Sequence, residues 1–449
     1  MKAPPWLSPA YNRQDMERRS FLEGIATAPV AAQQAYEQRT RGLPRLTIQQ
    51  VYPIVTSAGG RYQWVIVKVV TSEPGLYGIG SASNVHQAFT VATAIEKHLA
   101  PFWVGRDVDR IDDIWYATQY RNYRRSDTVL NNALSGLDMA LWDIKGKRAG
   151  MPVYSLLGGK VRDAVPCYGH ADGRSMDEVA DAVKGFMDRG FRHVRAQMGG
   201  YGGGGMIPPG QGRRVAGGFA GPAFDEEQYI DAIPKLFEHL RVKLGNGVKL
   251  IHDVHEHLSP TTAVELARRM EPYRMFFVED ILPPELIQWY RNIRQVTSTP
   301  MAMGEIFTNP QEWAPCISER LIDFARHRIS TVGGITAARR ITALCETFGV
   351  RTAWQEGGDN DPVNFAAACH VDLSSPAFGI QEENRWPELV HELLPGTPKL
   401  PDGYAYVNEA PGLGIDINEA MARKYPMDPP PGREDGFTVR AIDGSLVRP

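Results

Sequence analysis

The sequence is poor in cysteine, and its four cysteines show no pairing pattern. Cys167, Cys316, Cys345 and Cys369 form no CxxC motif, and their spacing fits neither a zinc site nor a disulfide framework. These thiols are therefore expected to be buried or half-buried side chains without a metal or redox role.

Long apolar runs and an excess of one charge are also absent. No stretch approaches the roughly 18 apolar residues of a membrane span, so no membrane partner is expected. The formal net charge of the 449 residues is −3, which gives no electrostatic reason to expect binding to nucleic acid. The hydrophobic fraction of 43% is ordinary for a globular protein with a sizeable core.

Residues 1–42 are set apart from the fold as an N-terminal extension. Arg18-Arg19 precedes a weakly apolar stretch of small residues, which is typical of a twin-arginine export signal. Glu23 and the shortness of the apolar stretch favour instead a surface arm with a chance arginine pair. The protein is therefore expected to be cytoplasmic, or periplasmic if the signal functions.

Residues 43–165 read as a small α+β domain. Three strand patterns come first without helices between them, which indicates an antiparallel meander. Helical patterns follow, and the clearest ends at Gly150-Met151-Pro152. The expected strands are Leu46–Val51, Trp64–Val70 and Gly75–Gly80, and the expected helices are Val85–Leu99, Asp109–Tyr120 and Asn131–Ala149.

Residues 166–385 alternate between strand and helix patterns eight times, which predicts a closed (β/α) barrel. The expected strands are Pro166–Tyr168, His193–Ala196, Lys249–His252, Met275–Val278, Pro300–Met303, Leu321–Phe324, Arg351–Trp354 and Phe378–Ile380. Residues 386–449 are rich in proline and glycine and are expected to pack back on the N-terminal domain or on a neighbouring subunit.

Three of these strands run into a carboxylate. Asp253, Glu279 and Glu305 follow successive strands at an even spacing of 26 residues (279 − 253 and 305 − 279), about the length of one βα unit. They would then meet at one rim of the barrel, where chemistry occurs in this architecture. Converging carboxylates repel one another, and oxygen-only ligation suits Mg²⁺. The alternative is that each is an ordinary acidic residue in a salt bridge.

Several further stretches resemble the enolase superfamily, and specifically its mannonate/gluconate dehydratase branch. The resemblance covers most of the chain, from Leu46 to Trp386. It lies in Ala133–Lys147, Val194–Gln197, His252–Glu256, Phe277–Asp280, Gly304–Trp313, Gly333–Thr336 and Phe378–Glu382. It implies a modified (β/α)8 TIM-type barrel with an N-terminal capping domain completed by the C-terminal tail. It also implies one Mg²⁺ and removal of a proton next to a carboxylate.

The resemblance also separates this chain from other branches. Arg195-Ala196-Gln197 lacks the paired lysines that one branch uses as bases, and Ala353-Trp354-Gln355 lacks the histidine of another. His255 lies two residues after Asp253, so on an extended strand end both would face the same pocket. His255 is thus the expected general acid.

The base that the resemblance implies is a tyrosine assisted by an arginine. Arg195 matches the arginine, and its charge is expected to lower the pKa of the tyrosine. Tyr201 is the candidate, although the family's tyrosine generally falls further along its loop. The family also usually has histidines at the positions of Gln355 and Arg328. The residues assigned to substrate binding are Arg326, Gln355, Glu356 and Glu382.

The leading hypothesis is therefore a Mg²⁺-dependent dehydratase of acid sugars, which forms 2-keto-3-deoxy acids and assembles as a homo-oligomer. Two alternatives remain. One is an epimerase or another lyase that acts on a carboxylate through the same enediolate. The other is a weakly active metal-binding regulatory protein, because Gln355 and Tyr201 depart from the family pattern.

Overall fold

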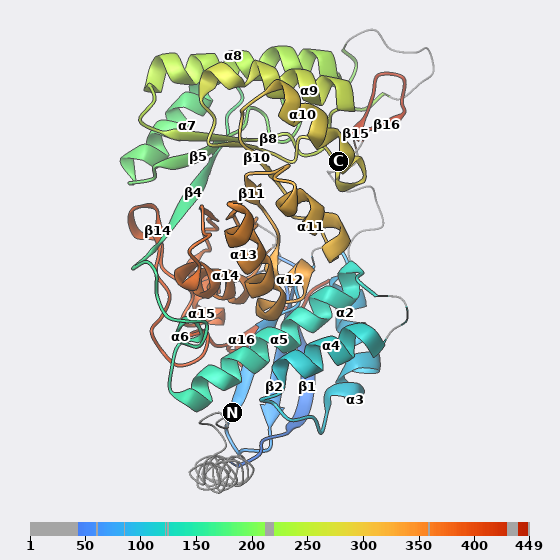
Figure 1. Cartoon of the computed structure of the whole chain (residues 1–449), viewed down its shortest axis with the longest axis vertical. Coiled ribbons are helices and arrows are strands. Elements are labelled where there is room, and N and C mark those ends of the chain that lie inside the picture. The colour runs from blue at the N-terminus through green and yellow to red at the C-terminus, as the bar shows by residue number, and fades with distance from the viewer. Residues whose placement is uncertain are drawn as a thin grey trace, which may run out of the picture. The chain divides into compact units, whose positions relative to one another are not determined.

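Figure 1 shows the computed structural model of the chain, which divides into two compact units, residues 1–46 and Thr47–Pro449. The structure describes residues 44–59, 62–84, 86–121, 123, 125–211, 220–357, 360–428 and 439–447. The predicted N-terminal extension, residues 1–42, lies outside the described residues. All the described helices and strands belong to the second unit.

An antiparallel sheet opens the second unit. It consists of β1 (Ile48–Thr56), β2 (Trp64–Thr71) and β3 (Tyr77–Ser81) in the order β1-β2-β3. The predicted meander is therefore present, and β1 extends five residues beyond its predicted end at Val51 (56 − 51). Trp64, Val65, Ile66 and Val67 of β2 are fully buried, so both faces of this central strand are covered.

The long helix α5 (Thr128–Ala149) packs directly on β3, and glycine makes the close approach feasible. A Cβ atom on Gly80 would lie 2.1 Å from the carbonyl oxygen of Gly136 in α5. Asp127 caps the N-terminus of α5 by accepting from the Leu130 N–H group at 2.8 Å, and Gly150 ends the helix in the left-handed conformation with φ 66°. The remaining helices of this region are α2 (Ala88–Ala94), the π-helix η2 (Ile95–Leu99), α3 (Ala100–Trp103), α4 (Ile111–Arg121) and α6 (Val153–Leu156).

Eight parallel strands form the predicted barrel. Their order is β4-β5-β8-β9-β10-β11-β12-β13, and β13 pairs with β4. Between β12 and β13 the ring is closed by a parallel bridge from Thr352 to Phe378. The strands are β4 (Val165–Ala171), β5 (His193–Ala196), β8 (Lys249–Asp253), β9 (Phe277–Glu279), β10 (Met301–Met303), β11 (Phe324–Ala325), β12 (Arg351–Thr352) and β13 (Gln381–Glu382).

Helices alternate with these strands, and α7 and α8 pack against each other beside β4 and β5 (Figure 1). The elements are α7 (Met176–Asp188), β6 (Met206–Ile207), β7 (Ala223–Phe224), α8 (Glu226–Leu244), α9 (Pro260–Arg269), η3 (Glu271–Tyr273), η4 (Pro284–Trp289), α10 (Tyr290–Val296), α11 (Pro310–Ser318), α12 (Ile329–Val332), α13 (Ile335–Phe348) and α14 (Pro362–Ser374). The strand β6 pairs with β7 as a short hairpin after β5.

The interior of the barrel is filled by one buried side chain from most of its strands. Because alternate residues of a strand face opposite sides, each strand sends one residue of this layer inward. The layer consists of Tyr168, Ile251, Phe277, Ala302, Phe324, Ala353 and Ile380, each 0% exposed. The barrel is therefore a packed core, and any site must lie at its rim.

The C-terminal segment contacts both the antiparallel sheet and the barrel. Tyr77 of β3 donates to Asp416 at 2.6 Å, and Lys68 of β2 binds Glu419 at 2.6 Å. The strand β14 pairs antiparallel with β4. The domain boundaries at residues 165 and 385 stay a prediction. The elements of this segment are α15 (Glu388–Leu393), η5 (Pro401–Gly403), β14 (Tyr404–Ala405), α16 (Glu419–Ala422), β15 (Val439–Arg440) and β16 (Leu446–Val447).

Among the described helices, none combines the length and the apolar character needed to cross a bilayer.

Candidate active site

Three predicted carboxylates lie at the same rim of the barrel. Asp253 and Glu279 are the last residues of β8 and β9 and pair directly across the two strands. Glu279 also pairs with Ala302 of β10, three residues before Glu305. Two strand ends differ from the prediction, because Asp253 and Glu279 are strand residues rather than the first loop residues. Parallel strands end at a common edge, so the even spacing predicts this location correctly.

A fourth acidic residue, Asp280, lies close to Glu279 and Glu305. One carboxylate oxygen from each of Glu279, Asp280 and Glu305 lies within 4.8 Å of those of the other two. Sequence reasoning missed Asp280, because consecutive residues of a strand face opposite sides. Its backbone is left-handed with φ 40°, which ends the strand alternation and lets two consecutive carboxylates meet.

Two carboxylate oxygens of this group have no hydrogen-bond partner among the described residues. Within the parts of the chain that the structure describes, Glu279 Oε2 and Asp280 Oδ1 are buried and accept no hydrogen bond. Burial raises the pKa of Glu279 well above its usual range, and burial with repulsion by Glu305 and Glu279 does the same for Asp280. Unpartnered buried carboxylate oxygens at this spacing fit a hard divalent cation such as Mg²⁺.

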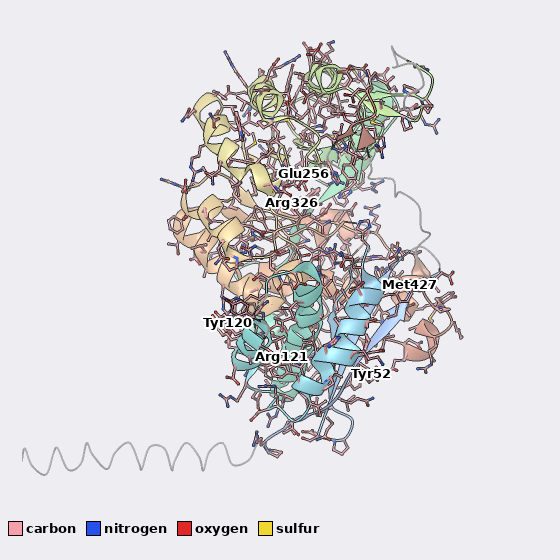
Figure 2. All side chains as sticks on the ribbon, turned by 90° about the vertical axis from the view of Figure 1, so that its right-hand side faces the viewer. Tyr52, Tyr120, Arg121, Glu256, Arg326 and Met427 are labelled. Carbon is pink, nitrogen blue, oxygen red and sulfur yellow. The ribbon has the colours of Figure 1, made fainter. Side chains whose placement is uncertain are left out.

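Arg326 is the internal cation that touches this group. It is fully buried on the segment after β11 and is labelled in Figure 2. Its Nε atom contacts Glu279, its Nη2 atom donates to Glu382 at 2.7 Å, and Glu305 lies 3.8 Å from Nη2. Arg326 is therefore engaged by carboxylates of three strand ends, and its assignment to substrate binding stays a prediction.

Both carboxylate oxygens of Asp253 accept hydrogen bonds from other residues of the site. Its Oδ2 atom accepts from Arg195 Nη1 at 3.0 Å, and its Oδ1 atom accepts from the backbone N–H group of His255 at 2.9 Å. Asp253 is outside the group of close oxygens formed by Glu279, Asp280 and Glu305. Its role as the third metal ligand stays a prediction.

The three predicted catalytic side chains lie together. Arg195 Nη2 donates to the Tyr201 hydroxyl at 2.9 Å, and the rings of Tyr201 and His255 stack with centroids 4.1 Å apart. Arg195 acts to lower the pKa of Tyr201, as expected, but the net direction is upward. Burial raises the pKa of Tyr201, Asp253 and Glu305 add to the rise, and Arg195 opposes it without reversing it. Arg195 therefore offsets part of the rise in the pKa of Tyr201.

His255 reaches Tyr201 by a different backbone path from the predicted one. Strand alternation predicts an extended backbone at this position, but β8 ends at Asp253, and His255 is left-handed with φ 55°. The turn allows the His255 N–H group to bind the Asp253 side chain. The histidine thus arrives at the rim because of the turn rather than by strand alternation.

His170 is a residue of this site that the sequence prediction missed. Arg195 Nη2 lies 3.1 Å from His170 Nδ1, and Glu382 Oε1 lies 2.9 Å from Nε2. A guanidinium only donates, so Nδ1 accepts and Nε2 carries the proton. Burial and Arg195 lower the pKa of His170, which keeps it neutral. The predicted strand stopped at Tyr168, whereas β4 runs to Ala171 and places His170 at the rim.

Glu382, Gln355 and Glu356 are the remaining predicted site residues at this rim. Glu382, at the end of β13, binds Arg326 and His170, and the backbone N–H group of Glu356 donates to Glu382 Oε2 at 2.7 Å. Arg326 and His170 keep the pKa of Glu382 well below its usual range against burial. Gln355 is 8% exposed and Glu356 is 0% exposed. The predicted substrate-binding residues are thus clustered at one side of the rim.

Comparisons with known proteins decide the family. The N-terminal domain of mandelate racemase/muconate lactonizing enzymes matches residues 45–158, and the enolase C-terminal domain-like family matches residues 178–421. A D-galactonate dehydratase family member of Musicola paradisiaca is 48% identical over 423 residues, covering 91% of this chain and 100% of that protein. The chain belongs to the D-galactonate dehydratase family of the enolase superfamily. This confirms the predicted resemblance and fold class.

Solved structures agree with this assignment. An enolase of Pantoea ananatis with bound D-gluconate and Mg is 47% identical, has a TM-score of 0.86 and covers 90% of this chain and 100% of its own. A mandelate racemase/muconate lactonizing enzyme-like structure from Labrenzia alexandrii is 26% identical, with a TM-score of 0.74, and covers 86% of this chain and 98% of its own. As a member of the D-galactonate dehydratase family, the protein is an enzyme of the hydro-lyase type that acts on sugar acids.

Proposed function

We propose that the protein is a Mg²⁺-dependent dehydratase of D-gluconate or D-mannonate, which removes water to give a 2-keto-3-deoxy acid. The observation that carries this proposal is the contact of Tyr201 with both Arg195 and His255 beside the strand-end carboxylates. A base and an acid next to one metal-binding rim are what an elimination of water requires. The similar Pantoea ananatis enolase holds D-gluconate and Mg, which supports this substrate class.

The metal would be held by Asp253, Glu279 and Glu305, with Asp280 beside them. Bound Mg²⁺ supplies a Lewis acid for the substrate carboxylate, which makes the neighbouring C2 proton more acidic. The unpartnered oxygens of Glu279 and Asp280 support a cation at this place.

Tyr201 removes the C2 proton, and Arg195, which donates to its hydroxyl, stabilises the phenolate form. The electron pair of the broken C2–H bond forms the C2–C3 double bond. His255 gives a proton to the C3 hydroxyl, which departs as water. The resulting enol then becomes the 2-keto-3-deoxy acid by a proton shift from the C2 hydroxyl to C3.

The test is a panel of C5 and C6 sugar acids incubated with purified protein and Mg²⁺, with 2-keto acid formation as the readout. Formation of product from D-gluconate or D-mannonate is expected. Exchange of the C2 hydrogen for deuterium without loss of water would support an epimerase or another lyase instead. No turnover and no exchange across the panel would favour the regulatory alternative. The assembly of the protein as a homo-oligomer and its cytoplasmic or periplasmic location also stay predictions.

A further inference from the structure

The segment from the end of β12 into the first turn of α14 carries a set of polar side chains that are almost completely buried. Gln355 is 8% exposed, whereas Glu356, Asn360, Asp361 and Asn364 are each 0% exposed. Burying polar groups is unfavourable unless hydrogen bonds compensate. Gln355 is the member of this set whose side chain is least completely buried.

This segment is held firmly at Asp361. One of its oxygens accepts from the hydroxyl groups of Ser81 and Ser83, at the end of β3 and just after it. The other accepts from backbone N–H groups in the first turn of α14, including that of Asn364 at 3.1 Å. Asp361 thus anchors the chain next to Asn360, and the backbone N–H group of Asn360 donates to the Gly357 oxygen at 2.9 Å.

Asn360 determines which way the amide of Gln355 faces. Asn360 Nδ2 donates to the backbone oxygen of Gln355 at 3.1 Å and to its Oε1 atom at 3.1 Å. A backbone carbonyl only accepts, so the Asn360 atom must be the nitrogen. The Gln355 atom that faces it must then be the acceptor Oε1. The Gln355 Nε2 atom is left over, and it donates to no residue in the described ranges.

Gln355 lies on the rim beside the proposed site. Its backbone N–H group donates at 2.9 Å to the oxygen of His327, which lies just after the end of β11. The next N–H group, of Glu356, donates to Glu382 Oε2, the same atom that binds Arg326. The backbone at Gln355 is therefore anchored between segments that carry the proposed substrate-binding residues Arg326 and Glu382.

We propose that Asn360 is a positioning residue for specificity, which holds Gln355 so that its Nε2 group donates to an acceptor oxygen of the sugar acid. This inference rests on the proposed function. An amide does not titrate in the neutral range, so the contact offers a donor at every pH where the enzyme is folded. Substrates with an oxygen at this place are favoured over deoxy analogues, because a fixed donor without an acceptor is left unpaired.

The test is Asn360→Asp, measured as KM and kcat for the sugar acid that the wild type turns over. The new carboxylate cannot donate, so the Gln355 amide reverses, donates Nε2 to this carboxylate and turns Oε1 to the substrate. KM is expected to rise about tenfold, the equivalent of one hydrogen bond, while kcat stays within about twofold. Asn360→Ala, which adds no charge, is expected to raise KM about threefold and covers the case in which the aspartate variant does not fold.

The matched control is Asn384→Asp. Asn384 Nδ2 donates to the Gly357 oxygen at 3.2 Å, so this variant removes a donor to the same segment without touching Gln355. An equal rise in KM in both aspartate variants, or an unchanged KM in both Asn360 variants, would overturn the inference while the proposed function stands. A wild type that neither binds nor turns over any sugar acid with Mg²⁺ would overturn both.

Discussion

At the scale of single residues, Arg195 links three side chains of the site, because it contacts Asp253, Tyr201 and His170. Asp253 could be placed from the sequence because an apolar strand leads directly to it, and Arg195 could be placed through the family resemblance. Sequence reasoning could not place His170, because nothing in the sequence marks the true end of β4. It also could not give the direction of the Tyr201 pKa, which depends on burial and on carboxylates from other strands.

Tyr201→Phe tests the base. The variant keeps the ring that stacks on His255 but removes the hydroxyl that Arg195 binds. We expect kcat to fall by about 10² to 10⁴, as for the loss of a general base, with little change in the affinity for the sugar acid. Steady-state kinetics and calorimetric titration give the two values. Tyr116→Phe, at a half-exposed position of α4, is the control. A kcat of Tyr201→Phe within a few-fold of wild type would remove Tyr201 from the mechanism.

A pair of asparagine variants tests the metal ligands. Asp253→Asn is expected to weaken Mg²⁺ binding at least about tenfold more than Asp280→Asn, because a missing ligand matters more than a neighbouring oxygen. Calorimetric titration with Mg²⁺ alone measures both affinities. The opposite order would replace Asp253 by Asp280 in the proposed ligand set, as the close oxygens of Glu279, Asp280 and Glu305 would then imply.

At the scale of elements, apolar runs predict each strand of the antiparallel meander and of the barrel, but not its bounds. They miss the short strands β6, β7, β14, β15 and β16. The strand at His193–Ala196 is found as predicted, whereas β11 is shifted to Phe324–Ala325 and β13 to Gln381–Glu382. Strand ends depend on pairing partners far away in the sequence. The left-handed turns at His255 and Asp280 are hidden for the same reason, since neither residue type requires that conformation.

The close packing of α5 on β3 requires a glycine at position 80, which can be tested by substitution. In Gly80→Ala the new methyl would meet backbone atoms of α5, which cannot move independently. We expect the free energy of unfolding to fall by about 3 kcal/mol, measured by urea unfolding. Gly185→Ala in α7, where a Cβ meets nothing within 4 Å, is the matched control and is expected to be neutral or slightly stabilising. Equal effects of the two substitutions would contradict the close packing.

At the scale of the whole molecule, hydrogen bonds join parts of the chain that are far apart in the sequence, including the C-terminal segment. His370 of α14 accepts from the Tyr154 N–H group at Nδ1 and donates from Nε2 to the Leu413 oxygen. This arrangement needs the neutral ring, and burial lowers the pKa of His370 to about 4. Alternation of strands and helices predicts a barrel, but such links between remote segments have no signature in a single sequence.

The pKa of His370 gives a pH dependence of stability with a definite sign. The unfolded state binds a proton near pH 6.5 and the folded state only near pH 4, so the contribution is present above pH 6.5 and is lost as the pH falls towards 4. The loss amounts to about 3 kcal/mol. In urea unfolding, His370→Gln should flatten this slope relative to wild type, whereas His98→Gln at an exposed position should not. Parallel pH profiles of wild type and His370→Gln would contradict the buried neutral ring.

The central claim is that carboxylates from neighbouring strand ends hold a divalent cation which makes a sugar acid lose water. The most direct measurement is the formation of 2-keto-3-deoxy acid from D-gluconate and D-mannonate as Mg²⁺ is titrated into metal-free wild-type protein and Glu279→Gln. We predict product that rises with Mg²⁺ and saturates in the wild type, and none above background in the variant. Equal product without Mg²⁺, or equal product from Glu279→Gln, would contradict the claim.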